Sequence, residues 1–103
     1  MKVVFFSESG IVGKVDRNFP NARNDIAWSI MMNADWCPYG KQPTEHYDLG
    51  VVTIPKTKPD LDVDWFKQYC DKIVIMQEGP HWYFQDYSVE QQFNFVENLR
   101  KAD

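Results

Sequence analysis

The chain has 103 residues, of which 44% are hydrophobic, 16% aromatic and 25% charged. This length and composition indicate one globular domain over residues 1–103 and exclude an intrinsically disordered chain. The apolar runs are short, whereas a membrane-spanning helix needs roughly twenty apolar residues, so we expect no membrane partner. The amino terminus lacks the apolar stretch and cleavage site of a signal peptide, which favours a cytoplasmic protein.

Eleven basic and fifteen acidic side chains give a formal net charge of -4. Nucleic-acid binding depends on phosphate neutralisation by basic side chains, so this charge argues against nucleic acid as a general partner. Cys37 and Cys70 have no CxxC motif or Cys/His cluster beside them, and we expect free buried thiols. Because His46 and His81 are also isolated from other ligand types, the sequence predicts no metal site.

Short runs of apolar, β-branched and aromatic residues predict strands over Lys2–Ser7, Gly50–Ile54 and Lys72–Gln77. All of these runs are almost continuously apolar, which is typical of parallel strands covered on both faces. Parallel strands need crossovers of a dozen or more residues, and the intervals between these runs are long enough to hold helices.

Two helices are expected between the strands. The first is predicted over Ala22–Asn33, where apolar residues recur at helical spacing before Pro38. The segment Trp36–Tyr47 contains prolines and a glycine, and predicts a loop with a short edge strand at its start. Asp60 and Asp62 offer N-cap oxygens to the second helix. The residues that recur on the apolar face of that helix are Val63, Phe66 and Cys70.

The last helix begins at Ser88, which forms a capping box with Gln91. Its expected buried face consists of Val89, Phe93, Val96 and Leu99. The alternation of strands and helices predicts an α/β fold, a small Rossmann-like open sheet that is mainly parallel, with three to four strands and helices on its faces. Such a sheet leaves edges and helix faces to be covered, so a homo-oligomer is an expected partner.

Ligands of open α/β sheets bind beyond the carboxyl ends of the strands. The loop after the first predicted strand contains two glycines, which can bring backbone amides close to a phosphate or a sugar. Their spacing matches neither GxGxxG nor a Walker loop, and a simple turn also explains them. The candidate ligand-binding residues here are Glu8, Ser9, Gly10, Gly13, Lys14, Arg17 and Arg23.

The loop after the third predicted strand, residues 78–87, is the densest in polar and aromatic groups. Glu78 is a candidate general base, and His81 is a candidate proton shuttle or phosphate ligand. The aromatic side chains can stack on a sugar or a base, or they can simply fill the core beneath the loop. The candidate binding residues of this loop are Trp82, Tyr83, Gln85 and Asp86.

The segment Cys70–Tyr87 and the Gln-rich helix that ends in Asn98–Asp103 resemble the amino-terminal half of glycosyltransferases encoded by bacteriophages. The opening segment Lys2–Gly13 and the segment Pro20–Arg23 are similar to the same proteins. Those proteins look like members of the GT-B class, in which two Rossmann-like domains face each other across a cleft. The amino-terminal domain generally binds the acceptor, and the carboxyl-terminal domain holds most of the nucleotide-sugar.

The resemblance implies a domain that binds a nucleotide-sugar or a sugar acceptor, in the cytoplasm of a host cell. Glu78 or His81 would deprotonate the acceptor hydroxyl, and Arg17 or Arg23 would contact the diphosphate. It also implies a carboxyl-terminal catalytic domain as partner, without which this chain alone would be inactive, and it admits DNA as an acceptor. No cofactor is implied. The alternatives are a small viral protein that binds a ligand or inhibits a host protein without catalysis, and a purely structural interaction domain.

Overall fold

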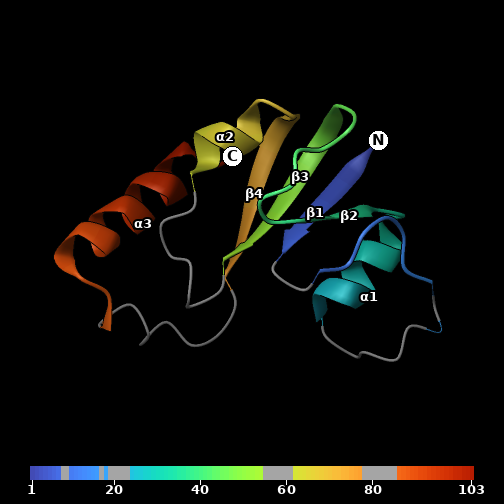
Figure 1. Ribbon diagram of the computed structural model, residues 1–103, viewed down its shortest axis with the longest axis horizontal. Coiled ribbons are helices and arrows are strands. Elements are labelled where there is room, and N and C mark those ends of the chain that lie inside the picture. The colour runs from blue at the N-terminus through green and yellow to red at the C-terminus, as the bar shows by residue number, and fades with distance from the viewer. Residues whose placement is uncertain (8–9, 17, 19–23, 55–61, 78–85) are drawn as a thin grey trace.

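The computed structural model describes residues 1–7, 10–16, 18, 24–54, 62–77 and 86–103 (Figure 1). The strands in this part of the chain are β1 (Val3–Ser7), β2 (Asp35–Pro38), β3 (Tyr47–Ile54) and β4 (Cys70–Gln77). The helices are α1 (Asn24–Met31), α2 (Val63–Lys67) and α3 (Val89–Lys101). None of these described helices has the length and apolar character that a bilayer crossing demands.

The strands form one parallel sheet in the order β2-β1-β3-β4. The predicted α/β class and the parallel direction are therefore confirmed. The short edge strand expected at the start of the segment after α1 is β2. β3 begins at Tyr47, before the predicted Gly50, because backbone bonds already hold the chain there. The Tyr47 amide donates to the Tyr69 carbonyl at 2.8 Å, and the Asp48 amide donates to the Lys2 carbonyl at 2.9 Å.

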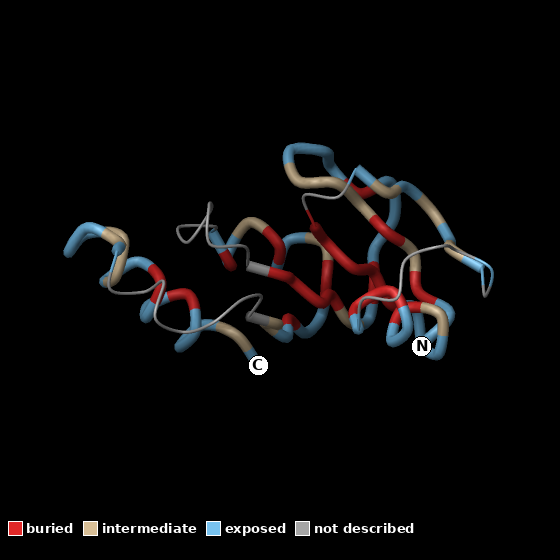
Figure 2. Tube along the Cα trace, turned by 90° about the horizontal axis from the view of Figure 1, so that it is seen from below, coloured by how far each residue is buried: buried red, intermediate tan, exposed pale blue. Residues whose placement is uncertain are grey.

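The sheet separates two hydrophobic clusters, because successive strand residues point to opposite faces. One cluster packs beneath α1 and contains Val3, Phe5, Ile26, Ala34, Trp36 and Val51. The other lies beneath α2 and contains Val4, Phe6, Val52, Val63, Phe66 and Ile73, with further buried residues around them. Figure 2 shows that most of the buried positions gather in the sheet. Helices therefore cover both faces, as the continuous apolar strands predict.

The second helix is shorter than the sequence predicts. Asp62 is its N-cap and accepts a hydrogen bond from the Asp64 amide at 3.0 Å. α2 ends at Lys67, and Cys70 is already the first residue of β4, where it pairs with Tyr47. The assignment of Cys70 to the helix face was therefore wrong, because pairing with β3 captures this residue. Both cysteines are free, as predicted; Cys70 is buried, whereas Cys37 is only partly buried.

The last helix begins as predicted, with the Gln91 amide donating to Ser88 Oγ at 3.2 Å and the Ser88 amide donating to Gln91 Oε1 at 2.9 Å. Its predicted buried face is wrong, because Phe93 is 70% exposed. The other members of that face are exposed as well, namely Val89, Val96 and Leu99. Phe95 and Asn98, which lie on another side of α3, are buried instead, and α3 extends away from the sheet (Figures 1 and 2).

Candidate functional site

The order of the strands defines where this sheet would bind a ligand. β1 connects through α1 to β2 on one side, whereas β3 connects through α2 to β4 on the other side. The two crossovers therefore diverge between β1 and β3, and open α/β sheets bind ligands at such a switch point, beyond the carboxyl ends of the strands. Because the strands are parallel, these ends share one side of the sheet, which we name the carboxyl edge (Figure 1).

Polar side chains fix the ends of the strands at the switch point. Thr53, which is almost fully buried, donates a hydrogen bond from Oγ1 to the Phe6 carbonyl at 3.0 Å. The Tyr39 amide donates to the Ser7 carbonyl at 3.1 Å, and the Tyr39 hydroxyl lies 3.4 Å from Thr53 Oγ1. These bonds join the end of β1 to β3 and to the segment after β2. The ends of these strands are thus held in fixed positions at the carboxyl edge.

A buried carboxylate that the sequence analysis missed lies at the start of α1. Asp25 is 3% exposed, and its Oδ1 accepts a hydrogen bond from the Ile26 amide at 2.8 Å. The helix of a right-handed βαβ unit runs opposite to its strands, so this end of α1 lies at the carboxyl edge. An acidic residue in a first helical turn is common, and nothing else in the sequence distinguishes Asp25.

The predicted site residues fall into two groups. Those that lie outside the described residues are Glu8, Ser9, Arg17, Arg23, Glu78, His81, Trp82, Tyr83 and Gln85. The described ones are Gly10, Gly13, Lys14 and Asp86. Gly10 is exposed, has a φ of 79° and follows the last residue of β1, Ser7, by three positions. Asp86 is exposed just before α3.

Gly13 and Lys14 have other roles than the one predicted. The Gly13 amide donates to the Trp36 carbonyl at 3.0 Å, and the Trp36 amide donates to the Gly13 carbonyl at 2.8 Å. This bridge is antiparallel, so it carries the chain back along the outer side of β2 toward the amino ends of the strands. There Lys14 Nζ lies 3.1 Å from Asp35 Oδ1 and donates to the Asn33 carbonyl at 2.8 Å. The structure therefore separates Lys14 from the carboxyl edge and commits the Gly13 amide to the sheet.

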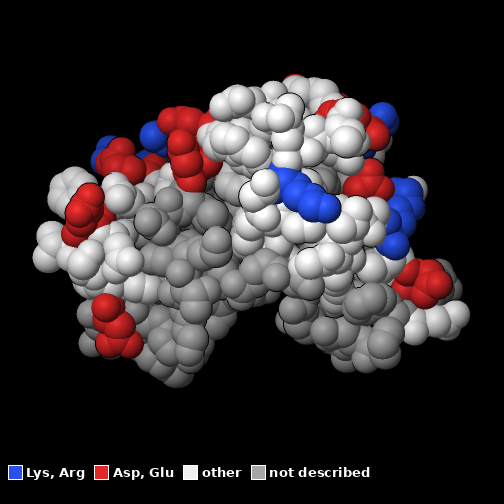
Figure 3. Space-filling model, viewed as in Figure 1, with Lys and Arg blue, Asp and Glu red and all other residues white. Residues whose placement is uncertain are grey.

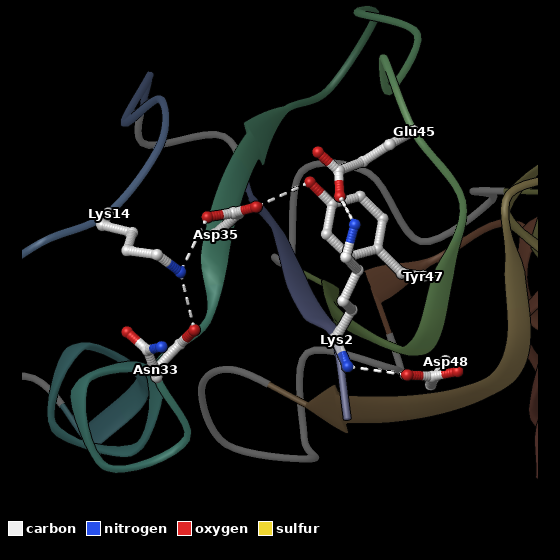
Figure 4. A network of polar contacts seen from close by, with 7 residues as sticks. All are labelled: Lys2, Lys14, Asn33, Asp35, Glu45, Tyr47 and Asp48. Carbon is white, nitrogen blue, oxygen red and sulfur yellow. Dashed lines mark hydrogen bonds and ion pairs between the residues drawn. The ribbon is translucent and has the colours of Figure 1, made fainter.

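Lys14 belongs to a polar cluster at the opposite side of the sheet, the amino-edge network (Figure 4). Its members are Lys2, Lys14, Asn33, Asp35, Glu45, Tyr47 and Asp48. The Tyr47 hydroxyl reaches from β3 to β2 and donates to Asp35 Oδ2 at 2.8 Å. The Lys2 ammonium pairs with Glu45, and the Lys2 amide donates to Asp48 Oδ2 at 2.7 Å. Sequence reasoning missed this network because β2 and β3 are not neighbours, and no local motif joins Asp35 to Tyr47.

The protonation states of the central pair suit a structural role. Burial alone would raise the pKa of Asp35, but hydrogen bonds from Tyr47 and Lys14 and the lysine charges outweigh it and hold that pKa below its usual value. Burial, and then the bond to Asp35, raises the pKa of Tyr47 far above its ordinary value. Asp35 therefore stays ionised and Tyr47 stays protonated at neutral pH. Each group stabilises the protonation state of the other, so the pair joins β2 to β3 rather than transferring a proton.

A pocket of about 340 Å³ opens beside this network and is lined in part by Asp35, Cys37, Glu45 and Tyr47. The two carboxylates are already paired with lysines, and burial raises the pKa of the Cys37 thiol, which disfavours the nucleophilic thiolate. No group of three or more metal-ligating side chains occurs among the residues that the structure describes. On the face drawn in Figure 3, acidic and basic side chains are interspersed, without a continuous basic surface among the coloured residues.

Removing the central charge of this network tests its role. Asp35→Asn is expected to lower the free energy of unfolding by about 1–3 kcal/mol at pH 7, because Lys14 and Tyr47 lose a charged acceptor. The folded pKa of Asp35 is depressed, so its contribution is present above the ordinary value of about 4 and is lost as the pH falls through the folded pKa. Urea denaturation should therefore show a difference from the parent chain that shrinks at low pH.

The control for this experiment is Asp71→Asn, which removes an exposed carboxylate paired with His46. Exposed ion pairs contribute about 0–1 kcal/mol, so this variant should change stability little at pH 7. An Asp35→Asn loss no larger than that of the control, or one that persists unchanged at low pH, would show that the network does not hold the sheet edge.

Comparisons of the chain with models of known protein families, with curated proteins and with solved structures find no match.

Proposed function

We propose that the chain is a Rossmann-like ligand-binding domain of the GT-B glycosyltransferase type, which holds a nucleotide-sugar or a sugar acceptor at the carboxyl edge. The observation that carries this proposal is the switch point between β1 and β3 in an all-parallel sheet. In this proposal the chain is one half of an enzyme, and a second domain completes the donor site. A chain without that second domain binds ligand but does not catalyse transfer.

The spacing of the strands supports a ligand of this size. Neighbouring strands lie about 4.8 Å apart, so the ends of β1 and β4, with β3 between them, are separated by about 10 Å. A sugar or a nucleoside diphosphate can contact the loops after both strands at once. In this proposal the site includes Gly10, which follows β1 in the sequence, and Glu78 or His81, which follow β4 in the sequence, as the acceptor base.

The proposal is tested by titrating UDP-glucose, related nucleotide-sugars and simple sugar acceptors into the ¹⁵N-labelled chain. We expect shifts in the amide resonances of Ser7, Gly10 and Thr53, because these residues lie at the carboxyl edge. The amides of Lys2 and Asp48, at the amino edge, should not move. The absence of shifts with every donor and acceptor, or shifts confined to the amino edge, would refute the proposal.

Two glycines provide a matched pair of variants. Gly10 and Gly13 have φ values of 79° and 75°, and a Cβ at either position would meet nothing within 4 Å. Alanine therefore introduces similar backbone strain at both, on the order of 1 kcal/mol. Gly10→Ala is expected to weaken ligand binding about tenfold, a change of about 1.4 kcal/mol. Gly13→Ala should leave binding unchanged, because the Gly13 amide already bonds Trp36.

Two further variants, Glu78→Gln and His81→Ala, address the proposed base. Both should be prepared in the isolated chain and titrated by calorimetry with the same ligands. We expect at least one of them to reduce acceptor affinity by about tenfold, since each removes a polar group from the proposed site. Unchanged affinity in both variants would show that Glu78 and His81 do not belong to the site. The resonance shifts would then decide whether a ligand binds at the carboxyl edge.

A non-catalytic module that binds a ligand or blocks another protein is the second candidate function. The exposed apolar face of α3 favours it, because contiguous apolar side chains on a surface often mark a site of protein contact. A module that blocks another protein would give no response to nucleotide-sugars. The titration described above therefore separates it from the proposed glycosyltransferase domain.

A further inference from the structure

The exposed apolar residues of α3 form a continuous surface, which we name the α3 stripe and define as Val89, Phe93, Val96 and Leu99. Phe93 follows Val89 by one helical turn, and Val96 and Leu99 follow at spacings of three, so neighbouring members contact along the helix. Val89 is 77% exposed and Phe93 70% exposed. Three members of the stripe, Val89, Phe93 and Val96, line a groove of about 420 Å³ together with Gln92, Glu97 and Arg100.

The attachment of α3 explains why this surface faces solvent. Asn98 Oδ1 accepts a hydrogen bond from the Val63 amide at 3.1 Å, which satisfies the amino end of α2. Phe95 is buried beside the ring of Tyr87, and Lys101 Nζ lies 2.8 Å from Asp64 Oδ2. These contacts fix the rotation of α3 about its axis. The stripe lies away from the buried Asn98, so the helix cannot bury it against its own sheet.

Charges of opposite sign lie beside the stripe at the two ends of the helix. Glu90 lies in the first turn, whereas Arg100 lies in the last turn, where it also pairs with Glu97 of the same helix at 3.5 Å. Two copies of α3 packed side by side in antiparallel directions would place Glu90 of each copy near Arg100 of the other. The same alignment sets Phe93 against Val96 of the second copy. A parallel alignment would instead oppose Glu90 to Glu90 and Arg100 to Arg100, which is unfavourable.

We propose that the α3 stripe is the contact surface of a homodimer, in which α3 packs antiparallel to α3 of a second copy about a twofold axis. The charge pattern is self-complementary in this arrangement, as a twofold interface requires. A stable interface buries about 800 Å² on each partner, and one helix about 20 Å long supplies less than that. The dimer is therefore weak and forms reversibly in the micromolar range. The inference goes beyond the proposed function and does not depend on the ligand at the carboxyl edge.

The first test is sedimentation velocity of the full chain over a concentration series. We expect a shift from monomer to dimer as the concentration rises through the micromolar range. Phe93→Glu should weaken association at least tenfold, because it places a charge in the centre of the interface. Asn94→Glu adds the same charge at the adjacent exposed position, which is rotated away from the stripe by about 100°, and should keep the dimer.

The second test exchanges the charges. Glu90→Arg and Arg100→Glu should each weaken the dimer, because each opposes like charges across the interface. The double variant restores one pair of opposite charges at each end and should recover most of the affinity. A parallel arrangement would show no such recovery. Circular dichroism establishes that α3 remains helical in each variant.

Two outcomes would overturn the proposal. One is a parent chain that stays monomeric at every concentration up to the millimolar range, which would leave the stripe to a different partner. The other is a dimer that persists unchanged in Phe93→Glu, which would place the interface elsewhere. Nucleotide-sugar titration of Phe93→Glu at low concentration keeps the two proposals separate, since loss of the dimer should not alter ligand binding at the carboxyl edge.

Discussion

Phe6→Ala is expected to lower the free energy of unfolding by about 3–5 kcal/mol, the largest effect of any single substitution considered. Phe6 is fully buried in β1, and its ring centroid lies 4.7 Å from that of Phe66 on α2. Alanine removes the ring and leaves a cavity between the sheet and the helix. Because small domains are stabilised by only about 5–15 kcal/mol, such a loss approaches the whole stability of the fold.

Phe6→Leu should be measured as well, since it preserves more of the volume and is expected to cost less than about 1.5 kcal/mol. The matched control is Phe93→Ala, which removes the same ring from an exposed helix position. It should change monomer stability by no more than about 0.5 kcal/mol. Urea denaturation at low protein concentration compares all three. Equal losses at Phe6 and Phe93 would mean that the buried face of α3 is assigned wrongly.

Gly50→Ala is expected to lower the free energy of unfolding by about 1–3 kcal/mol, because β3 passes close to buried side chains. A Cβ at Gly50 would lie 2.7 Å from Cys70 Sγ, 2.9 Å from Ile73 Cδ1 and 3.3 Å from Phe6 Cε2. Distances below 3 Å force a neighbour to move, and the first two of these residues are buried and closely packed. Alanine would recover about 0.5–1 kcal/mol of backbone entropy, which is less than the expected packing cost.

The neighbours of Gly50 allow this prediction to be checked by rescue. Cys70→Ala removes the Sγ atom and Ile73→Val removes the Cδ1 atom that a new Cβ would meet. Each should destabilise the parent chain, yet each should cost less in the Gly50→Ala background, with a coupling free energy above about 0.5 kcal/mol. Chemical denaturation of the single and double variants gives the cycle. Strictly additive losses would show that the close approach at Gly50 is not the cause.

The strands could be predicted because their pattern depends on a simple physical requirement. β1 is buried along its whole length and most of β3 is buried, and nearly continuous apolar runs suit that environment, whereas β4 leaves Val74 43% exposed. The parallel direction follows from the same pattern and from the long intervals between the runs. The exact boundaries are set by backbone pairing between distant segments. Tyr47 and Cys70 join the sheet because each pairs with the other across β3 and β4. The sequence around either residue does not reveal this pairing.

The buried face of α3 could not be predicted from periodicity, because apolar residues occupy more than one face of this helix. The number of apolar residues favours the α3 stripe as the buried face, because it has more of them than the other faces. Tertiary contacts decide otherwise, since Asn98 satisfies the Val63 amide and Phe95 packs beside Tyr87. These contacts on the opposite side of α3 thus leave the apolar majority of the helix exposed to solvent.

The position of the candidate site could be predicted in part. The carboxyl edge follows from parallel strands, and the bonds among Ser7, Tyr39 and Thr53 lie there. Gly13 and Lys14 were assigned to that edge by their closeness in sequence to β1. Their actual positions depend on an antiparallel bridge to Trp36, a long-range pairing that residue types and spacing do not encode.

The antiparallel bridge between Gly13 and Trp36 also bears on how the sheet resists aggregation, together with a contact at the other edge strand. An exposed edge strand can recruit strands from other molecules through its unpaired amides and carbonyls. On the outer edge of β2, Gly13 pairs with Trp36 through the antiparallel bridge. The outer edge of β4 is occupied by Asp103, whose amide donates to the Ile73 carbonyl at 2.7 Å and whose side chain accepts from the Ile73 amide at 2.9 Å. Each edge strand is therefore covered by the chain itself at one residue, which interrupts the row of free backbone groups that intermolecular β-structure would need.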